Sequence, residues 1–253
     1  MTLSDAELDR YARHIVLPEF GGAGQTRLKA ATVAVVGAGG IGSPAIQYLA
    51  GAGVGRLVLI DDDRVEPSNL QRQTIFGADD SGVPKVEAAA AAVRRLNPFV
   101  DVEPRAERID GENAARLLGG ADAVIDGSDS FATRLAVADA ALALRAPLVS
   151  AAVTRFEGQL AVYRGWEPAL PCYRCLVGDA PARDGGTCAE DGVLGPAAGV
   201  LGTLAALEAI RAVAPFGPDP AGALLIVDLL ALRFRSVRLP KDPGCLSCAQ
   251  RPV

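Results

Sequence analysis

Thr32-Val-Ala-Val-Val-Gly-Ala-Gly-Gly-Ile-Gly-Ser-Pro44 is the stretch that decides the fold. Its first five residues are apolar or β-branched, which predicts a short buried strand. The glycines that follow fit the G-x-G-x-x-G spacing, and the proline stands where the first turn of a helix tolerates it. The stretch therefore predicts a strand, a tight turn and a helix, in which backbone N–H groups and the helix N-terminus face a phosphate group.

The glycine-rich turn indicates a nucleotide site. Gly37, Gly39, Gly40 and Gly42 would let the backbone approach phosphate oxygens closely, and the next apolar run ends at Asp61. An acidic residue at the end of the second strand accepts hydrogen bonds from ribose hydroxyls in dinucleotide-binding folds. The alternative is a tight structural turn without a ligand. By itself the motif does not name the nucleotide, and it would favour a nicotinamide-dependent oxidoreductase.

Strand and helix patterns alternate along the first part of the chain. Ser4 and Glu7 form a capping-box signature for a helix over residues 5–15, which the glycines within residues 21–24 are expected to end. The alternation predicts an α/β protein of the Rossmann type, with a mostly parallel sheet and helices on both faces. Further strands are expected at residues 56–60, 100–104, 123–125 and 148–153, and further helices at 84–95, 111–118 and 131–144.

The second part of the chain, about residues 154–253, predicts an antiparallel region and a long loop. The loop, residues 178–186, combines Gly, Pro, Ala, Arg and Asp without periodicity. No linker separates this part from a nucleotide-binding core at about residues 30–153, so we expect one domain over residues 1–253. Within residues 154–253 we expect a strand at 159–163, an apolar helix at 197–213 and a hairpin of 224–228 with 233–238.

Composition excludes several classes of protein. The 253 residues are 50% hydrophobic and 22% charged, as in a globular enzyme, and the net charge of −5 disfavours nucleic acid as a partner. The sequence has no run of 18 uninterrupted apolar residues, so we expect a cytoplasmic protein with no membrane partner. His14 is the one histidine, which excludes His-rich catalytic metal sites, and we expect it to be structural.

The segment after Asp61 carries the positive charge that a triphosphate needs. It contains Ser68-Asn-Leu-Gln-Arg-Gln73 and, at the start of the next helix, Lys85. The glycine turn already suits the pyrophosphate of a nicotinamide cofactor, whereas adenylyl transfer from ATP develops further charge on the leaving pyrophosphate. We therefore assign Arg72 and Lys85 to the phosphates. The alternative for each is a solvated surface side chain.

A second acidic loop follows the strand predicted at residues 123–125. Asp126 and Asp129 lie there, at the edge where open α/β sheets place their ligands. Asp129 is a candidate Mg²⁺ ligand, because Mg²⁺ is commonly held by a carboxylate together with substrate phosphates. Either aspartate could instead cap the following helix.

The five cysteines form two Cys-x-x-Cys pairs and a singleton. Cys172 with Cys175, and Cys245 with Cys248, supply four thiolates, which suit a closed tetrahedral Zn²⁺ site with a structural role. Two disulfides or free thiols are the alternatives, and a reducing compartment disfavours them. Cys188 has no cysteine left as a partner. It is a candidate nucleophile that forms a thioester or persulfide, with an unreactive buried thiol as the equal alternative.

Together these motifs resemble the MoeB/ThiF adenylyltransferases, relatives of the ubiquitin-activating enzymes that serve molybdopterin, thiamine or similar sulfur-transfer pathways. The likeness covers nearly the whole chain. It implies ATP-dependent adenylylation of the C-terminal glycine carboxylate of a ubiquitin-like sulfur-carrier protein, giving an acyl adenylate and pyrophosphate. The carrier and the pathway stay open. Besides the motifs above, the likeness includes Arg10–Arg13, Pro84-Lys85, Asn97-Pro98, Glu157–Gln159, Pro171–Cys175, Thr187-Cys188 and Pro243–Cys245.

The resemblance also implies roles for individual residues. Arg13 would reach the phosphates of the neighbouring subunit in a homodimer, and Cys188 would stand where some members form a covalent link to the carrier or to sulfur. The Gly-Gly tail of the carrier would enter beneath residues 178–190, and a separate protein would donate the sulfur. The catalytic set implied is Arg13, Arg72, Lys85, Asp129 and Cys188. The ATP- and Mg²⁺-binding set is Gly37, Gly39, Gly40, Gly42, Asp61, Asp63, Ser68, Asn69, Leu70, Gln71, Arg72, Lys85, Asp129 and Ser130, the last standing where relatives often have Asn.

Three other functions stay open. A nicotinamide-dependent oxidoreductase would need an acid–base pair beside a hydride acceptor, and the single histidine and the cations stand against it. A non-catalytic, zinc-stapled binding module would bind a carrier but not ATP. A tRNA-modifying or peptide-modifying relative would differ in its acceptor.

Overall fold

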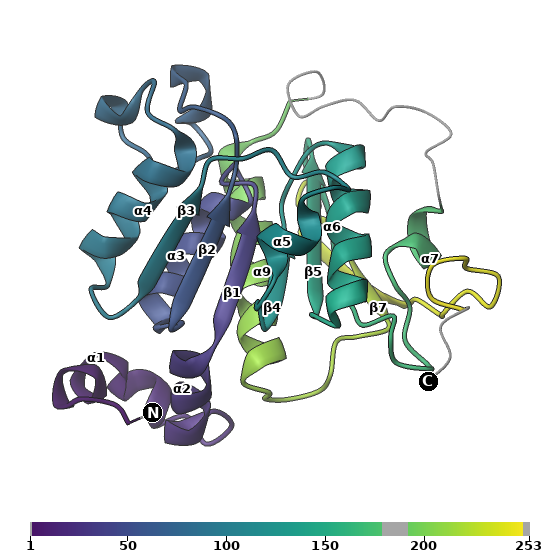
Figure 1. Ribbon diagram of the computed structural model, residues 1–253, viewed down its shortest axis with the longest axis horizontal. Helices are drawn as coiled ribbons and strands as arrows, with labels where there is room; N and C mark the ends of the chain where they lie inside the picture. The colour runs from purple at the N-terminus through teal and green to yellow at the C-terminus, as the bar shows by residue number, and fades with distance from the viewer. Residues whose placement is uncertain (1, 179–191, 250–253) are drawn as a thin grey trace.

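The computed structural model describes residues 2–178 and 192–249. The strands of this part form one eight-stranded sheet with helices on both faces (Figure 1). In their order across the sheet they are β3 (Asp101–Arg105), β2 (Arg56–Ile60), β1 (Thr32–Val36), β4 (Ala123–Asp126), β5 (Leu148–Thr154), β6 (Glu157–Tyr163), β7 (Ala223–Asp228) and β8 (Arg233–Arg238).

The sheet has a parallel half and an antiparallel half. Strands β1 to β5 are parallel, whereas β6, β7 and β8 each run antiparallel to the preceding strand. The α/β class with helices on both faces is therefore confirmed. The antiparallel strands extend the same sheet, because β6 pairs with β5 along all seven residues.

The predicted helices are all present, and two more, α2 and α7, were not predicted. Those that cover the two faces begin and end within a few residues of the expected bounds, and two 3-10 turns join the elements near the carboxyl edge of the sheet. The helices are α1 (Asp5–Ile15), α2 (Gly21–Ala30), α3 (Gly42–Ala52), α4 (Lys85–Leu96), α5 (Ala114–Leu118), α6 (Phe131–Leu144), α7 (Arg174–Val177) and α9 (Gly195–Val213), with 3-10 turns η1 (Pro67–Asn69) and η2 (Ala78–Asp80).

Helix α2 contains the glycines that were expected only to end α1. That prediction was wrong about their role: α1 ends at Ile15, and the glycines begin a second helix. Gly24 lies under the ring of Phe20, where a Cβ would come within 2.9 Å of the ring carbons. The Phe20 ring also meets His14, whose Nδ1 lies 3.0 Å from Gln25 Oε1. Gln25 and Leu28 of this helix are buried, and such burial outweighs the low helix propensity of glycine.

Alternate residues of β1 serve the two faces of the sheet. Val33 and Val35 belong to the core that includes α3, α4 and α9, and Ala34 and Val36 to the core that includes α5 and α6. This is the period of two that a strand imposes, and a strand covered on both faces needs apolar residues at every position. The continuous apolar run that predicted β1 therefore follows from its central place in the sheet.

The carboxyl ends of β1 and β4 lie side by side at the edge of the sheet drawn uppermost in Figure 1. Val36 of β1 is in register with Asp126 of β4, and β2 lies on the other side of β1. The order of the strands reverses here, since the chain leaves β1 toward β2 and later returns beside β1 as β4. Open α/β sheets bind ligands at such a switch point.

Helix α9 is apolar and buries one of its sides against the fold. In the described part of the chain it is the one helix long and apolar enough to cross a membrane by length and composition. Here it packs against α3, β5 and β6, with small residues such as Gly202 and Ala205 buried. A Cβ on Gly202 would lie 2.2 Å from the carbonyl oxygen of Ile41, so the close approach of α9 to the glycine turn depends on this glycine.

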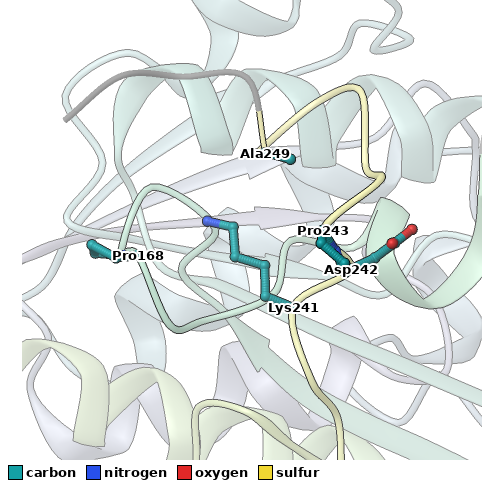
Figure 2. A pocket seen from close by; sticks show the side chains of 5 residues that line it. All are labelled: Pro168, Lys241, Asp242, Pro243 and Ala249. Atoms are coloured by element: carbon teal, nitrogen blue, oxygen red, sulfur yellow. The ribbon is translucent and has the colours of Figure 1, made fainter.

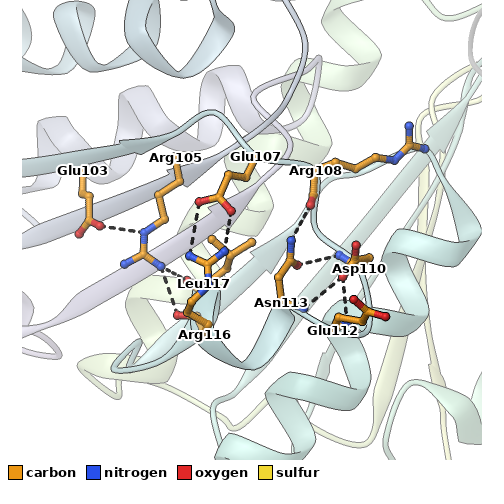
Figure 3. A network of polar contacts seen from close by, with 9 residues as sticks. All are labelled: Glu103, Arg105, Glu107, Arg108, Asp110, Glu112, Asn113, Arg116 and Leu117. Atoms are coloured by element: carbon orange, nitrogen blue, oxygen red, sulfur yellow. Dashed lines mark hydrogen bonds and ion pairs between the residues drawn. The ribbon is translucent and has the colours of Figure 1, made fainter.

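A network of ion pairs follows β3 and ties it to α5 (Figure 3). Arg105 donates to Glu103 at 2.8 Å and to the carbonyl oxygen of Leu117 at 2.5 Å. Arg116 pairs with Glu107 at 2.5 Å. Exposed pairs of this kind stabilise a fold only slightly. Their effect is to fix the connection between β3 and α5.

Candidate nucleotide site and cysteine cluster

The glycine turn depends on missing side chains at two positions and is open at a third. Gly37 has a φ of +87°, and a Cβ on Gly42 would lie 1.8 Å from the Gly37 carbonyl oxygen. A Cβ on Gly39 would meet only Gln73 Nε2, at 3.8 Å, within a 4 Å radius. Gly37 and Gly42 therefore close the turn, whereas Gly39 leaves space for a ligand beside the backbone.

Asp61 lies at the end of β2, next to this turn. Its Oδ2 accepts a hydrogen bond from the N–H of Ala38 at 2.7 Å, and its Oδ1 accepts one from the N–H of Asp63 at 2.8 Å. Burial raises the pKa of the Asp61 carboxyl, and the Lys85 ammonium and the two backbone hydrogen bonds partly oppose that rise. The fold thus holds an acceptor for hydroxyl groups beside the glycine turn.

Lys85 is a nearly buried cation at the same edge of the sheet. Its side chain is 7% exposed, and its Nζ pairs with Asp63 Oδ2 at 2.7 Å. Its backbone N–H also donates to the carbonyl oxygen of Asp63 at 2.9 Å. The alternative of a solvated surface lysine is therefore wrong. The fold keeps this charge close enough to the Asp61 carboxylate to oppose part of the rise in its pKa.

Arg72 folds over the glycine turn. A Cβ on Gly40 would lie 3.5 Å from Arg72 Cδ, so the aliphatic part of the side chain covers that glycine. Its Nη1 donates to the carbonyl oxygen of Ser68 at 3.1 Å. Next to it, Gln73 is buried, and its Oε1 has no hydrogen-bond partner. The turn is therefore bordered by a guanidinium and a buried carboxamide.

The other predicted residues of this segment have different surroundings. Asn69 is buried, and its carbonyl oxygen accepts the N–H groups of Arg72 and Gln73, so it shapes the loop. Leu70 packs against the hydrophobic core, and Gln71 is exposed. The structure therefore brings Arg72, but not Leu70, to the surface of the glycine turn.

The loop after β4 leaves Asp129 exposed. Asp126 Oδ1 accepts the N–H of Ser128 at 3.0 Å and its hydroxyl at 2.7 Å, while Asp126 Oδ2 is buried without a partner. Ser130 is the N-cap of α6, and its hydroxyl accepts the N–H of Thr133 at 3.5 Å. The alternative in which an aspartate caps α6 is therefore wrong. The Asp129 carboxylate faces solvent beside the switch point.

Arg13 belongs to α1, which lies below the sheet in Figure 1, on the side opposite the carboxyl ends of β1 and β4. It is exposed on α1, and the neighbouring Tyr11 packs on Gly53, where a Cβ would lie 2.3 Å from the ring. The Tyr11 hydroxyl accepts a hydrogen bond from Asn97 Nδ2 at 2.8 Å. Gly53 and Asn97 lie just before the first residues of β2 and β3, and the glycine turn lies at the other end of the strands. A five-residue strand spans roughly 17 Å. Arg13 therefore does not reach the glycine turn of its own chain.

Four sulfur atoms from the two Cys-x-x-Cys pairs lie together. All four are within 4.8 Å of one another, with Sγ–Sγ distances of 3.8 Å for Cys172–Cys175, 3.6 Å for Cys172–Cys245 and 3.4 Å for Cys175–Cys248. Four thiolates about 2.3 Å from one tetrahedral zinc ion would lie roughly 3.8 Å apart. These four cysteines are free, so the alternative of two disulfides is wrong. The donor set and its spacing fit zinc.

A depression beside the cysteine cluster involves the polypeptide before Cys245 (Figure 2). The ammonium of Lys241 donates to the carbonyl oxygens of Gly165 at 2.8 Å and of Glu167 at 3.0 Å. It is therefore engaged with the backbone, and it fastens the C-terminal segment to the residues after β6. The depression is lined by Pro168, Lys241, Asp242, Pro243 and Ala249.

Some predicted residues lie outside the described part, and some described contacts were not predicted. Cys188 and most of the predicted loop fall within residues 179–191, which the structure does not describe. The Lys85–Asp63 pair was not anticipated, although both residues were candidates. Arg134 was not anticipated at all: it donates to the carbonyl oxygens of Ser128 and Ala151. The contacts of Lys85 with Asp63 and of Arg134 with Ala151 have no sequence signal, because the fold brings their segments together.

The sequence profile of the ThiF family matches residues 11–247 of this chain. The chain belongs to the ThiF family. A SAMP-activating enzyme E1 of Haloferax volcanii is 46% identical over 256 residues, which cover 100% of this chain and 93% of that protein. A sulfur carrier protein adenylyltransferase of Thermus thermophilus is 44% identical over 259 residues, covering 100% of this chain and 95% of that protein.

Longer proteins and solved structures are also similar to this ThiF-family chain. An adenylyltransferase and sulfurtransferase MOCS3 of Bos taurus is 49% identical over 253 residues, but the chain covers 55% of that protein. The crystal structure of E. coli MccB with ATP superposes with a TM-score of 0.80 at 24% identity, over 97% of this chain and 75% of that one. At that identity the likeness concerns the fold alone.

Proposed function

We propose that this ThiF-family protein uses ATP to adenylylate the C-terminal glycine carboxylate of a ubiquitin-like sulfur-carrier protein. The observation that carries the proposal is Lys85, a nearly buried cation held beside Asp61 and the glycine turn at the switch point of the sheet. Two relatives similar over almost their whole length are named a SAMP-activating enzyme E1 and a sulfur carrier protein adenylyltransferase. Their names support both the reaction and the class of acceptor.

ATP would bind along the carboxyl edge of β1 and β2. Backbone N–H groups at Gly39 and Gly40 would face the phosphates, and the Asp61 carboxylate would accept hydrogen bonds from the ribose hydroxyls. The guanidinium of Arg72 and the ammonium of Lys85 offset the charge of the triphosphate. Asp63 keeps Lys85 in place before the nucleotide binds.

The reaction itself requires little acid–base chemistry. A C-terminal carboxylate has an ordinary pKa of about 3.5 and is ionised at neutral pH. One of its oxygens attacks the α-phosphorus of ATP, the bond from that phosphorus to the bridging oxygen breaks, and pyrophosphate leaves with the electron pair. The product is an acyl adenylate. Holding two anions together is the main difficulty, and Arg72 and Lys85 are placed to reduce it.

Mg²⁺ fits the aspartate loop of this chain. Asp129 is exposed beside the switch point, and a carboxylate that shares the ion with substrate phosphates is the usual protein ligand for Mg²⁺. The bound ion would neutralise charge on the leaving pyrophosphate. Below it, Asp126 and Ser128 fix the shape of the loop, and the hydroxyl of Ser130 is engaged in capping α6.

Zn²⁺ fits the cysteine cluster. Cys172, Cys175, Cys245 and Cys248 leave no open coordination position, so the role we assign to the ion is structural. It would join the segment after β6 to the C-terminal segment. The two cysteine pairs are far apart from each other in sequence, and the metal would link them as a covalent bond otherwise could.

A homodimer would complete the site. Arg13 is too far from the glycine turn of its own chain, but it is exposed and free to approach the phosphates of a second copy. The cytoplasmic location stays a prediction from the sequence. The entry of the carrier tail beneath residues 178–190, a covalent role for Cys188 and a separate sulfur donor also stay predictions.

Carrier-dependent exchange of pyrophosphate into ATP tests the proposal. The protein would be assayed with a panel of carriers that end in Gly-Gly, beside Arg72→Ala, Asp129→Ala and the surface control Arg116→Ala. We expect exchange with at least one carrier, a loss of about 100-fold or more in the first two variants and no loss in the control. Carrier binding without exchange would favour the non-catalytic module, and tight nicotinamide binding the oxidoreductase. Unchanged exchange in Arg72→Ala or Asp129→Ala would refute the role given to that residue.

A further inference from the structure

Gln73 is a buried side chain with an unused hydrogen-bonding group. It is 3% exposed, and its Oε1 is shielded from solvent without a hydrogen-bond partner. A buried polar atom left unpaired lowers stability, so folded proteins rarely keep one without a use for it. Gln25 has the ordinary arrangement: it is fully buried, its Nε2 donates to the carbonyl oxygen of Ala52 at 2.8 Å, and its Oε1 lies 3.0 Å from His14 Nδ1. The carboxamide of Gln73 therefore does not serve the fold as that of Gln25 does.

The other end of the Gln73 carboxamide faces the glycine turn. Its Nε2 lies 3.8 Å from the place where a Cβ on Gly39 would stand, in the space that Gly39 leaves open beside the backbone. The aliphatic part of Arg72 covers the next glycine, Gly40, where a Cβ would lie 3.5 Å from Arg72 Cδ. Two consecutive side chains thus border two consecutive glycines, the carboxamide at the first and the guanidinium at the second.

The backbone of Gln73 is held on both sides. Its N–H donates to the carbonyl oxygen of Asn69 at 3.0 Å, and its carbonyl oxygen accepts the N–H of Phe76 at 3.2 Å. The N–H of Ile75 donates to the hydroxyl of Ser43 at 2.9 Å, and Ser43 is fully buried in the first turn of α3. The carboxamide is therefore preorganised, so a ligand that meets it does not have to order it.

The order of groups along the turn indicates which phosphate Gln73 meets. Asp61, the acceptor assigned to ribose hydroxyls, accepts the N–H of Ala38 at 2.7 Å, one residue before Gly39. Arg72, whose charge suits the leaving pyrophosphate, lies over the residue after Gly39. In ATP the α-phosphate lies between the ribose and the other two phosphates, as Gly39 lies between these two groups. The carboxamide beside Gly39 is therefore placed for the α-phosphate.

We propose that Gln73 is a further catalytic residue, whose Nε2 donates a hydrogen bond to a non-bridging oxygen of the α-phosphate during adenylyl transfer. The inference rests on the proposed function in taking ATP as the nucleotide. As the carboxylate oxygen of the carrier bonds to the α-phosphorus and the bond to the leaving pyrophosphate breaks, the non-bridging oxygens gain negative charge. A donor fixed beside them stabilises that charge. No proton moves to or from Gln73 in this step.

Gln73→Met and Gln25→Met form a matched pair of variants, because each replaces a buried carboxamide by an unbranched apolar side chain. We expect Gln73→Met to keep the Tm of the nucleotide-free protein or raise it by up to about 4 °C, since an unpaired polar atom is removed. Gln25→Met should lower the Tm by about 2–8 °C, since Ala52 and His14 lose their partner, and should bind nucleotide as the parent does. Thermal unfolding without nucleotide measures the difference.

Nucleotide binding and turnover are measured on the same proteins. Affinity for an ATP analogue with a methylene group between the α- and β-phosphorus is obtained by calorimetry, and turnover by carrier-dependent pyrophosphate exchange. We expect Gln73→Met to weaken analogue binding about tenfold and to lower the kcat of exchange about 100-fold, because the hydrogen bond strengthens in the transition state.

Sulfur substitution locates the contact. Two diastereomers of ATP carry sulfur, a weak hydrogen-bond acceptor, in place of one or the other non-bridging oxygen of the α-phosphate. Only one of these oxygens can lie against Gln73 Nε2. The ratio of the exchange rates with the two diastereomers should therefore change about tenfold between the parent and Gln73→Met, and it should be the same in the parent and Gln25→Met.

Parent-like exchange in Gln73→Met, or a diastereomer ratio equal to that of the parent, would overturn the proposal. A loss of Tm as large as that of Gln25→Met, in both Gln73→Met and Gln73→Leu, would also overturn it, because Gln73 would then be a structural residue. Failure of the proposed function is distinguishable. The parent would show no exchange with any carrier, while the affinity for the analogue would still report whether Gln73 contacts the phosphates.

Discussion

Two glycines of the same turn should respond to alanine in opposite ways. In Gly42→Ala the added Cβ would lie 1.8 Å from the Gly37 carbonyl oxygen, a backbone atom that cannot yield without deforming β1 or α3. Overpacking of this kind costs about 1–3 kcal/mol. In a chain of this length each kcal/mol lowers the Tm by about 2–4 °C. Gly42→Ala should therefore lose stability.

Gly39→Ala should instead fold normally and lose nucleotide affinity. Gly39 does not have the positive φ of Gly37, and its Cβ would meet only Gln73 Nε2, at the ordinary distance of 3.8 Å. The methyl group would occupy the space through which a phosphate oxygen approaches the backbone. Loss of one charge-assisted hydrogen bond costs about 1.5–3 kcal/mol, or roughly 10- to 150-fold in affinity.

The assay is thermal unfolding with ATP titration by calorimetry, for both variants and for Gly51→Ala as a control. Gly51 lies on the exposed side of α3, and a Cβ there meets nothing within 4 Å. Gly51→Ala should therefore bind ATP as the parent does and gain up to about 1 kcal/mol. Parent-like ATP affinity in Gly39→Ala, or parent-like stability in Gly42→Ala, would refute this account of the turn.

Three further predictions concern charge, metal and assembly. Lys85→Met removes the main group that lowers the pKa of Asp61. ATP affinity needs the ionised Asp61 carboxylate, so on acidification the variant should lose affinity at a higher pH than the parent does. An unshifted midpoint of that loss would contradict the prediction. Cys175→Ser should release the metal measured by atomic absorption and lower the Tm by about 2–4 °C for each kcal/mol of metal-linked stability; retained zinc and Tm would exclude the assigned role. Arg13→Ala and Arg72→Ala should each be inactive, but a mixture refolded together should recover about a quarter of parental sites, and no recovery would exclude a shared site.

The parallel half of the sheet could be predicted because local and tertiary signals agree there. Residues 32–36 and 56–60 are apolar runs that end at a glycine turn and at Asp61, and strands buried on both faces need such runs. The four cysteines could be grouped from the sequence, because two Cys-x-x-Cys pairs supply the four thiolates that one zinc site needs. In both cases the residue types leave few physical solutions.

The rest depends on contacts that no local pattern encodes. The glycines of α2 lie in a helix that buries Gln25 and Leu28, and β6 joins the edge of β5 although its sequence gives no partner. The burial of Lys85 and its pair with Asp63 could not be predicted, because a lysine in the first turn of a helix is mostly exposed. The two hydrogen bonds from Arg134 could not be predicted from the sequence, because their acceptors are backbone carbonyl oxygens, which every residue has.

The two outer strands of the sheet also bear on how the protein avoids polymerising. An open sheet leaves unpaired N–H and C=O groups at both margins, which are templates for fibril growth. At one margin β3 contains Pro104, which has no N–H to offer, and at the other β8 carries Arg233, Arg235 and Arg238. Clustered like charges make stacking of two β8 margins costly. The sheet can therefore remain open, with its polar ladder uncovered, and still resist aggregation.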